Sequence, residues 1–531
     1  MIIPASGRAA SGAIMVRLLA LTLAALTLAA LTLTSLAILA GGVQAAPADK
    51  ERGAKIYAKR CLMCHGEEGD GDGPGAKRLN PPPRDFTEAL YKFKTTGADD
   101  PMPNDDDILS MIRDGMPGTS MPGWKDVLSE QEMLDLVLYL KIFAEIEEEK
   151  PEEQIDYGTQ VATSPESIAQ GDKLFHDGER CSECHGNDGR GDAVKRLKDD
   201  AGARTWPRNL TKPWTYRVSN QPKDIYRRIT TGITGTQMPS FADPKSKKKL
   251  SIEERWHVAN YVVSLAAKGH PVRPENTVIK AARIEGALPA KPGDAAWDGA
   301  EKTTFFLVPQ IIAKPRFFTP AGDTISARAL YNDREIALLI EWDDRSKSIP
   351  GDATAQKIAE PDMGQDAVAI QLPIAPSDGV EKPYFIWGDA THPVNLWKWQ
   401  SGTTKAPEAA EVMTARGLDD VNKRGASGVS AKGIYKDGTW RVVMKRARAT
   451  GDAENDIQFD EGRFIPVAFS AWDGSNGEKD RSHTLTTWYW LQLKPEAGAK
   501  PLIAGILTAL ILAGLLIWWA RAAGARPEPG A

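Results

Sequence analysis

The residues best suited to chemistry in this 531-residue chain are four cysteines, which fall into two copies of one motif. They are Cys61, Cys64, Cys181 and Cys184, and each pair is followed directly by His-Gly. Two thiols three positions apart can bond the two vinyl groups on one edge of a porphyrin, and the next histidine can bind the iron. The motifs therefore predict two covalently attached haem c groups with His65 and His185 as proximal ligands.

Other uses of a Cys-x-x-Cys pair fit the sequence less well. A redox-active pair does not need the histidine, and a structural zinc ion needs four ligands in one cluster. A disulfide framework would not need His-Gly after each pair. The chain also lacks a Lys/Arg cluster typical of nucleic-acid binding, and its net charge is only −5.

The sequence around the two motifs is repeated as well. PRDFT at 83–87 matches PRNLT at 207–211, and GMPGTSMPGW at 115–124 matches GITGTQMPSF at 232–241. Each copy starts with a short helical pattern before the first cysteine. Each ends in a capping box, at Ser129 and at Ser251, followed by apolar residues at helical spacing.

The repeat indicates the sixth iron ligand of each haem. The first copy offers several methionines, but the second offers only Met238, which aligns with Met121. These residues lie 56 positions after His65 and 53 after His185. We therefore expect Met121 and Met238 as axial ligands. Met116 remains the alternative for the first haem, although it aligns with an isoleucine.

Each copy resembles a class I cytochrome c domain, an all-α fold, over residues 48–145 and 165–270. The resemblance implies that Arg84 and Arg208 pair with haem propionates, the alternative being solvated arginines. It also implies haem attachment outside the cytoplasm. His176 and His257 are expected to be structural or exposed.

Both ends of the chain carry apolar segments. Residues 1–46 contain an apolar run followed by small residues, which indicates a signal peptide or a retained anchor. Residues 502–520 hold no charge and span about 28 Å as a helix. Arg521 and Arg526 follow, so a single C-terminal span would leave the body in the periplasm of a bacterial inner membrane.

From about residue 296 the apolar runs become short and are separated by turn residues, which predicts a β-sandwich. The phrases ARALYNDREIALLIEWDD, GDATHPVNLWKWQ and WDGSNGE resemble the haem-binding γ subunit of ethylbenzene dehydrogenase. Relatives of that subunit serve molybdenum enzymes of the dimethyl sulfoxide reductase type. The resemblance implies a third, non-covalent haem b, which the family holds between a methionine and a lysine.

This chain departs from that ligand pattern. Trp387 stands where the family methionine is usual, and His483 stands near the family lysine position, with Lys479 close by. His392 and His483 are the two histidines of this region, so we expect them as ligands. His392 as a turn residue and Met363 as the sulfur ligand remain alternatives.

The sequence thus predicts two all-α cytochrome c domains, a β-sandwich and a C-terminal transmembrane helix. The expected parts are a signal peptide or anchor (1–46), cytochrome domains (47–148 and 165–272), linkers (149–164 and 273–295), a sandwich (296–496), a membrane helix (501–521) and a cytoplasmic tail (522–531).

The expected function is electron transfer, without catalysis by this chain. The expected partners are a molybdenum catalytic subunit, an iron–sulfur subunit, and a soluble cytochrome c, a quinone complex or a terminal oxidase. A free-standing dihaem cytochrome with a non-haem docking module is the alternative. A dihaem peroxidase would need an open iron site, which the two matching methionines disfavour.

Overall fold

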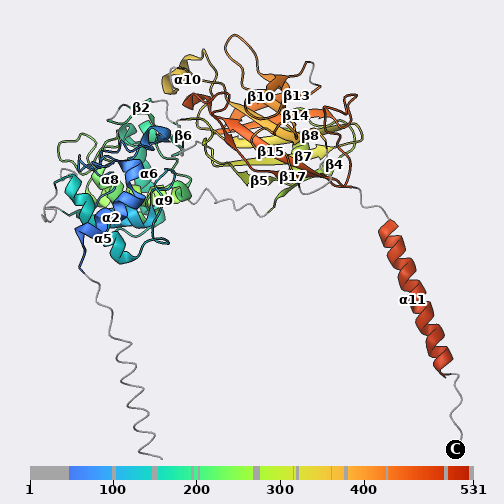
Figure 1. The fold of residues 1–531 in the computed structure, drawn as a ribbon, viewed down its shortest axis with the longest axis horizontal. Coiled ribbons are helices and arrows are strands. Elements are labelled where there is room, and N and C mark those ends of the chain that lie inside the picture. The colour runs from blue at the N-terminus through green and yellow to red at the C-terminus, as the bar shows by residue number, and fades with distance from the viewer. Residues whose placement is uncertain are drawn as a thin grey trace, which may run out of the picture.

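A computed structural model describes most of the chain from residue 47 to residue 524 (Figure 1). The described ranges are 47–97, 103–145, 154–192, 196–266 without 201 and 203, 276–317 without 315, 322–359, 362–375, 381–425, 428–495 and 500–524. The predicted signal peptide and cytoplasmic tail lie outside the described residues, apart from 522–524.

The first cytochrome region is a set of helices around one apolar cluster. They are α2 (Lys50–Arg60), α3 (Leu62–His65), α4 (Asp105–Asp114) and α5 (Glu130–Phe143). Helices α2 and α5 cross at Gly53, where an added Cβ would lie 2.2 Å from the carbonyl oxygen of Asp135. The Ser129–Glu132 capping box starts α5, as the sequence predicts.

The second cytochrome region repeats this arrangement. Its helices are α6 (Pro165–His176), α7 (Ser182–His185), α8 (Pro222–Thr231) and α9 (Ile252–Ala266). Helices α6 and α9 cross at Gly171, where an added Cβ would lie 2.1 Å from the carbonyl oxygen of His257. The apolar cores also correspond, because Tyr57 packs on Tyr139 as Phe175 packs on Tyr261.

The all-α expectation holds only in part. Strands β2 (Leu197–Lys198) and β3 (Arg204–Thr205) pair inside the second cytochrome region. Strand β1 (Leu79–Asn80) of the first region pairs in parallel with β6 (Arg316–Phe317) of the strand-rich region. Two-residue strands leave no recognisable alternation in a sequence, so periodicity could not reveal them.

The C-terminal half forms one large sheet, which confirms the predicted β-rich character. Its thirteen strands, among the described residues, run in the order β12-β11-β10-β9-β15-β17-β4-β7-β8-β14-β13, with β16 beside β15 and β5 beside β7. The strands are β4 (Val278–Arg283), β5 (Thr303–Phe306), β7 (Thr324–Tyr331), β8 (Glu335–Asp343), β9 (Ala367–Pro373), β10 (Val394–Gln400), β11 (Ala409–Ala415), β12 (Val421–Lys423), β13 (Ser430–Lys436), β14 (Thr439–Ala447), β15 (Phe464–Trp472), β16 (Thr484–Leu485) and β17 (Tyr489–Leu493).

The sheet folds over on itself to enclose the main core. Trp399 of β10 lies 4.9 Å from Trp440 of β14, ring centroid to ring centroid, although these strands are far apart in the hydrogen-bonded order. Strand β15 joins the two halves, because one end pairs with β9 and the other with β17. The sandwich-like packing therefore comes from one continuous hydrogen-bonded path.

Two ranges that the sequence suggests are linkers contribute to the folded parts. In the range 273–295, β4 places Ile279 and Ala281 in the core with exposed Lys280 between them, a strand alternation. In the range 149–164, Ile155 is buried in the second cytochrome core, and its N–H donates to the Thr95 carbonyl. Charged neighbours in both ranges conceal these buried positions.

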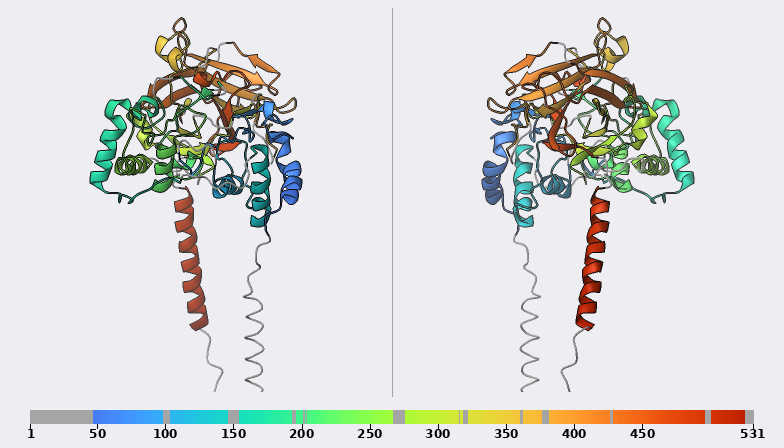
Figure 2. Two further views of the ribbon diagram at one scale, coloured as in Figure 1. Left: turned by 90° about the vertical axis from the view of Figure 1, so that its left-hand side faces the viewer. Right: turned by 90° about the vertical axis from the view of Figure 1, so that its right-hand side faces the viewer.

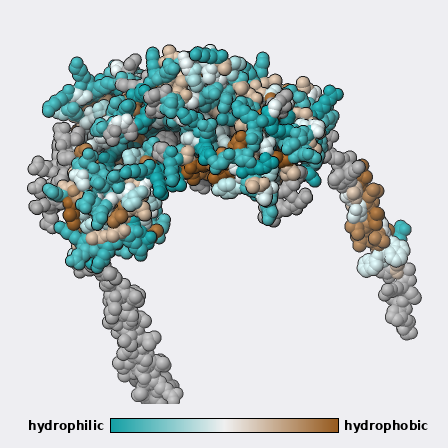
Figure 3. All heavy atoms as spheres, turned by 45° about the horizontal axis from the view of Figure 1, so that its top comes forward, coloured by the Kyte–Doolittle hydropathy of each residue, from teal (hydrophilic) through white to brown (hydrophobic). Residues whose placement is uncertain are grey.

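The last described element is α11 (Lys500–Gly524), which projects away from the body in both views of Figure 2. Residues 503–522 are long and apolar enough to cross a membrane, and among the described residues no other helix meets that criterion. Figure 3 shows the apolar surface of this helix set apart from the mainly hydrophilic body.

Candidate haem sites

The two Cys-x-x-Cys-His motifs fold in the same way. Helices α3 and α7 each end at the histidine. The Nδ1 atom of His65 lies 3.0 Å from the carbonyl oxygen of Arg84, and Nδ1 of His185 lies 3.0 Å from that of Arg208. A carbonyl can only accept, so Nδ1 donates and Nε2 keeps its lone pair for iron.

Burial supports the same protonation state. It lowers the pKa of His65 and His185 from the ordinary value, with partial compensation from the two backbone hydrogen bonds. Both imidazoles are therefore neutral at pH 7, as an iron ligand must be. No disulfide joins these cysteines within the described part of the chain, so each pair can supply both sulfurs for thioether bonds.

The hydrogen bonds of the two methionine loops correspond one to one. The N–H of Met121 donates to Thr119 Oγ1 at 3.1 Å, and the N–H of Met238 donates to Thr236 Oγ1 at 3.2 Å. The Met121 carbonyl accepts from the Met116 N–H at 3.0 Å. In the second copy, the Met238 carbonyl accepts in the same way from Ile233 at 3.1 Å. This correspondence supports Met121 over Met116 as the ligand prediction for the first haem.

The second motif opens into a cavity of about 690 Å³. Cys181, Cys184, His185 and Met238 all line it, together with apolar residues of α8 and α9. Apolar walls, two thiols, a neutral imidazole and a thioether sulfur are the groups that a covalently bound haem requires. The residues of the second region thus fit a haem c.

Arginines gather around the same cavity. Arg208, Arg217, Arg228 and Arg345 all line it. Burial, and then the neighbouring Arg217 and Arg345, lower the pKa of Arg208 to about 9. Burial lowers the pKa of Arg228 to about 10. Positive groups held so close together favour anions, and haem propionates would supply two.

Arg84 and Arg208 act on the haem motifs through their backbone, in addition to the role predicted for their side chains. Sequence reasoning assigned the side chains of Arg84 and Arg208 to propionates, which stays a prediction. The structure adds that the backbone carbonyls of the same two residues orient the proximal histidines. The repeated Pro-Arg phrase was the available signal, but it did not distinguish side chain from backbone.

The first motif is packed more tightly. The ring of His65 stacks on Phe86 with centroids 4.4 Å apart, and Phe86 in turn stacks on Phe143. Burial raises the pKa of Cys61 to about 11. The donor set of this site, two thiols, a neutral imidazole and Met121 in the matching loop, is the same as in the second region and fits haem c equally.

In the sheet region, His483 is fully buried, and its Nε2 has no hydrogen-bond partner among the residues that the structure describes. Its ring lies between Trp387 and Trp472, with centroid distances of 4.9 and 4.8 Å. Burial lowers the pKa of His483 to about 3, so the ring is neutral. Its Nδ1 lies 3.1 Å from the Asp480 carbonyl, the arrangement already seen at His65 and His185.

The other predicted residues of this region lie in different surroundings. The His392 side chain is 46% exposed, with Nδ1 3.3 Å from Asp389 Oδ1 and Nε2 3.9 Å from Glu381 Oε2. Lys479 is exposed and lies 3.4 Å from Asp362. Met363 is partly buried. His392 therefore occupies a polar surface turn, which matches the alternative reading of it as a turn residue.

Sequence reasoning missed Lys398, whose Nζ lies 4.4 Å from the ring of Trp472. Burial lowers the pKa of Lys398 from its usual value. Lys398 also acts on His483, since its charge further lowers the pKa of that histidine. The only available signal was a lysine inside the phrase NLWKWQ, on a strand whose other residues are buried apart from Gln400.

Comparisons with protein families match three regions of the chain. Residues 48–140 match the family described as cytochrome c oxidase, cbb3-type, subunit III, and residues 168–266 match cytochrome c. Residues 294–420 and 408–484 match the family described as ethylbenzene dehydrogenase.

Three similar proteins are named as haem or γ subunits of redox enzymes. A protein of Haloferax mediterranei named as a respiratory nitrate reductase haem subunit is 26% identical over 45% of this chain and 82% of its own length. The chlorate reductase γ subunit of Ideonella dechloratans is 26% identical over 45% of this chain and 95% of its own. The dimethylsulfide dehydrogenase γ subunit of Rhodovulum sulfidophilum is 29% identical over 26% and 52%, respectively.

Among solved structures, one chain of the reducing HAO-like protein complex of Kuenenia stuttgartiensis is 38% identical. It covers 42% of this chain and 99% of that chain, with a TM-score of 0.38. The two motifs, the repeated geometry and the two cytochrome c matches fall in the same two regions of the chain. This chain therefore combines two cytochrome c domains with a domain of the ethylbenzene dehydrogenase γ-subunit type.

Proposed function

We propose that this protein is the non-catalytic electron-transfer subunit of a molybdenum oxidoreductase complex. The likeness to haem and γ subunits of reductases and a dehydrogenase supports the complex, and the position of the second haem cavity supports the electron-transfer role. The lining of this cavity includes Lys92 and Phe93 from the first cytochrome domain and Arg345 and Thr439 from the sheet domain. A redox group placed there would border both neighbouring parts.

Side-chain contacts hold these parts together. Lys212 of the second cytochrome domain lies 2.5 Å from Asp323 and 2.7 Å from Asp343 of the sheet domain. Trp206 Nε1 donates to Asn476 Oδ1 at 2.7 Å. Such contacts keep redox groups at a fixed separation, which electron transfer requires.

The chain's own residues orient and tune the haem groups. A haem supplies the one-electron chemistry of its iron when bound. The carbonyls of Arg84 and Arg208 fix the histidine tautomers, and the matched loops present Met121 and Met238. Two protein ligands on each iron leave no position for substrate, so the proposed role is transfer and not catalysis.

We extend the proposal to a third, non-covalent haem b in the sheet domain, with His483 as an axial ligand. The support is the buried Nε2 atom, which has no partner among the described residues although its ring is otherwise fixed. An unpaired buried nitrogen is costly, and an iron atom would satisfy it. The second ligand is His392, Met363 or Lys398, each within the same domain.

The proposed location is the bacterial inner membrane, with α11 as the single span and the body in the periplasm. The apolar length of α11 supports this placement. The proposed partners are a molybdenum catalytic subunit and an iron–sulfur subunit. A soluble cytochrome c, a quinone complex or a terminal oxidase would exchange electrons with this protein at the end of the electron path opposite the molybdenum subunit.

The deciding experiment is purification of the full chain from its own host under mild detergent. Acid–acetone extraction would separate a non-covalent haem from covalent haem, and elemental analysis would detect molybdenum. Two covalent haems, one extractable haem b and co-purifying molybdenum are the expected result. A lone chain with two covalent haems and no extractable haem would instead indicate a free-standing dihaem cytochrome.

Ligand variants sharpen the test of the third haem. His483→Ala should remove the extractable haem b and leave both covalent haems in place. His392→Ala is the matched comparison, and its loss of haem b would identify the second ligand. Full retention of haem b in His483→Ala would refute the proposed ligand, even if molybdenum still co-purified.

A further inference from the structure

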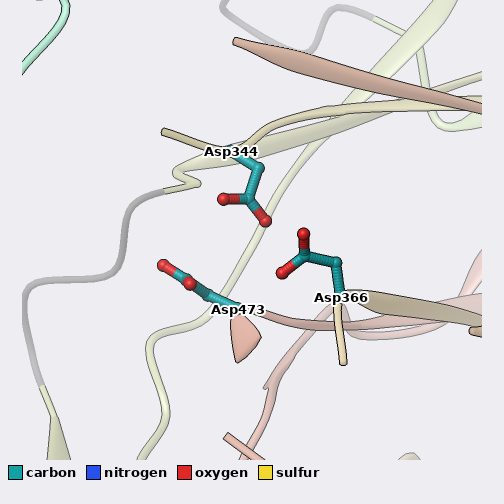
Figure 4. Close-up of side chains that lie close together, drawn as sticks. All are labelled: Asp344, Asp366 and Asp473. Atoms are coloured by element: carbon teal, nitrogen blue, oxygen red, sulfur yellow. The ribbon is translucent and has the colours of Figure 1, made fainter. Parts of the chain in front are cut away.

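Three buried aspartates meet at one end of the folded sheet (Figure 4). Asp344 directly follows β8, Asp366 directly precedes β9, and Asp473 directly follows β15. One carboxylate oxygen from each lies within 4.8 Å of the others. Asp344 turns one oxygen toward Asp366 in Figure 4.

A fourth carboxylate belongs to the same place. Glu478 is only 4% exposed, and its Oε2 accepts from the Asp473 N–H at 2.9 Å. Its Oε1 has no hydrogen-bond partner among the described residues, and neither does Asp344 Oδ2. Asp344, Asp473 and Glu478 also line one small cavity of about 10 Å³, the size of a single bound ion or water.

The remaining oxygens are held firmly by hydrogen bonds. Asp366 Oδ2 accepts from the Ser348 N–H at 2.6 Å and from Trp440 Nε1 at 2.9 Å. Asp366 Oδ1 accepts from the Gly474 N–H at 2.9 Å. The Asp366 carboxylate is thus fixed, whereas Asp344 Oδ2 and Glu478 Oε1 have no hydrogen-bond partner among the described residues. Both of these residues line the small cavity.

One buried cation, Arg345, acts on this cluster, because its charge interacts with those of Asp473, Asp344 and Glu478. None of the four carboxylates has an ion-pair partner within 4 Å in the described part of the chain. Arg345 is the nearby cation, and its guanidinium lies 4.3 Å from the Trp206 ring. Burial, together with Asp473, raises the pKa of Asp366 to about 7, and burial raises the pKa of Asp344 and Glu478 well above their usual values.

We propose that Asp344, Asp366, Asp473 and Glu478 form a binding site for a divalent cation of the Ca²⁺ type. Carboxylate oxygens are the ligands that hard cations prefer, and Ca²⁺ accepts irregular oxygen geometry. The cluster offers no sulfur or imidazole, which disfavours zinc and copper. A bound dication would add its positive charge to that of Arg345 beside the four acids, and it would satisfy the two oxygens that lack hydrogen-bond partners among the described residues.

The cation would tie β8, β9 and β15 together at the end of the sheet nearest the second cytochrome domain. Asn476, between Asp473 and Glu478, accepts the hydrogen bond from Trp206 of that domain. The proposed site therefore stabilises the sheet domain and the loop that contacts the second haem cavity.

The test uses the purified full chain in detergent, stripped with EGTA and then titrated with Ca²⁺. Unfolding is followed by tryptophan fluorescence. At a 100-fold excess of free Ca²⁺ over Kd, the midpoint of the sheet domain should rise by about 5–10 °C. Tb³⁺ provides a second readout, because Trp440 and Trp472 lie beside the cluster and can sensitise its emission.

Asp344→Asn is the informative variant, since it keeps the shape and removes one charge and one free oxygen. It should lose the Ca²⁺-dependent shift and most of the sensitised Tb³⁺ emission. Asp362→Asn is the matched control, because Asp362 is an exposed acid near the same loop. It should respond as the wild type does.

Two results would overturn the proposal. A wild-type midpoint that is unchanged between EGTA and millimolar Ca²⁺, with no sensitised emission, would mean that protons alone neutralise the cluster. Equal Ca²⁺ responses in wild type and Asp344→Asn would place cation binding elsewhere. The wild-type measurement stands even if the variant does not fold.

Discussion

The two cytochrome c domains share their internal geometry and differ in their surroundings. The histidine, methionine and helix-crossing contacts match between copies to within a few tenths of an ångström. The neighbouring residues do not match. Met63, inside the first motif, is 61% exposed, whereas its counterpart Glu183 pairs with Lys248 at 2.7 Å. The motif thus fixes the local haem site, while residues from both neighbouring domains help to line the cavity at the second motif.

The largest expected effect comes from removing one pair of cysteines. Replacing Cys181 and Cys184 by alanine should halve the covalent haem and also weaken the contact with the sheet domain. Replacing Cys61 and Cys64 should halve the haem and leave that contact intact. Pyridine haemochrome spectra and urea unfolding would measure the two effects. Unchanged covalent haem in either variant would disprove attachment at that motif.

Exchanging the methionine ligand separates the two haems electrochemically. Met238→His should lower the reduction potential of the second haem only, and Met121→His that of the first, because a methionine ligand raises the potential. Potentiometric titration resolves the two transitions. Met116→Leu is the control and should change neither potential. A shift in Met116→Leu, with none in Met121→His, would make Met116 the ligand.

The contact between the second cytochrome domain and the sheet should depend on Lys212. Lys212→Ala leaves Asp323 and Asp343 without their cation and should lower the unfolding free energy by about 3 kcal/mol. Chemical denaturation measures this loss. Lys280→Ala is the control, because Lys280 forms an exposed pair with Glu301 and should change stability by less than about 1 kcal/mol.

The effect of Lys212 should also depend on pH. Burial raises the pKa of Asp323, but Lys212 and Trp214 outweigh burial and hold that pKa below its usual value. Burial lowers the pKa of Lys212, but Asp343 and Asp323 outweigh it, so that pKa is raised. The carboxylate contribution is complete above about pH 4 and is lost as pH falls through the folded pKa of Asp323. The lysine contribution is complete below about pH 10 and is lost as pH rises through the folded pKa of Lys212. A stability difference from Lys212→Ala that does not shrink at either extreme would contradict this account.

The smallest expected effect tests the likeness of the two helix crossings. Gly53→Ala and Gly171→Ala each force a Cβ toward a backbone oxygen, so each should lower the unfolding free energy of its own domain by about 1–3 kcal/mol. Gly293→Ala is the control, since an added Cβ there meets no atom within 4 Å. Unequal losses at Gly53 and Gly171 would mean that the two domains relax differently around the crossing.

Sequence reasoning succeeded where structure is local. The capping boxes at Ser129 and Ser251 act over a few residues, and the structure confirms both. Met121 and Met238 as iron ligands stay a prediction. Sequence reasoning did not find the pairing of β1 with β6, because that contact joins residues more than two hundred positions apart. It missed the acidic cluster for the same reason, since Asp344, Asp366 and Asp473 come together only when the sheet folds over. His483 was predicted from its place near the family lysine position and as one of the two histidines of this region. Its burial between Trp387 and Trp472 brings together residues that are far apart in the sequence.

The short connection between β17 and α11 limits how far the sheet domain can lie from α11. Strand β17 ends at Leu493 and α11 begins at Lys500, so six residues separate them. Fully extended, they reach about 20 Å. An α11 embedded in a bilayer would therefore keep the sheet domain close to the lipid surface. The cytochrome domains could then search only a thin layer of solution, which raises their effective concentration for membrane-bound electron acceptors.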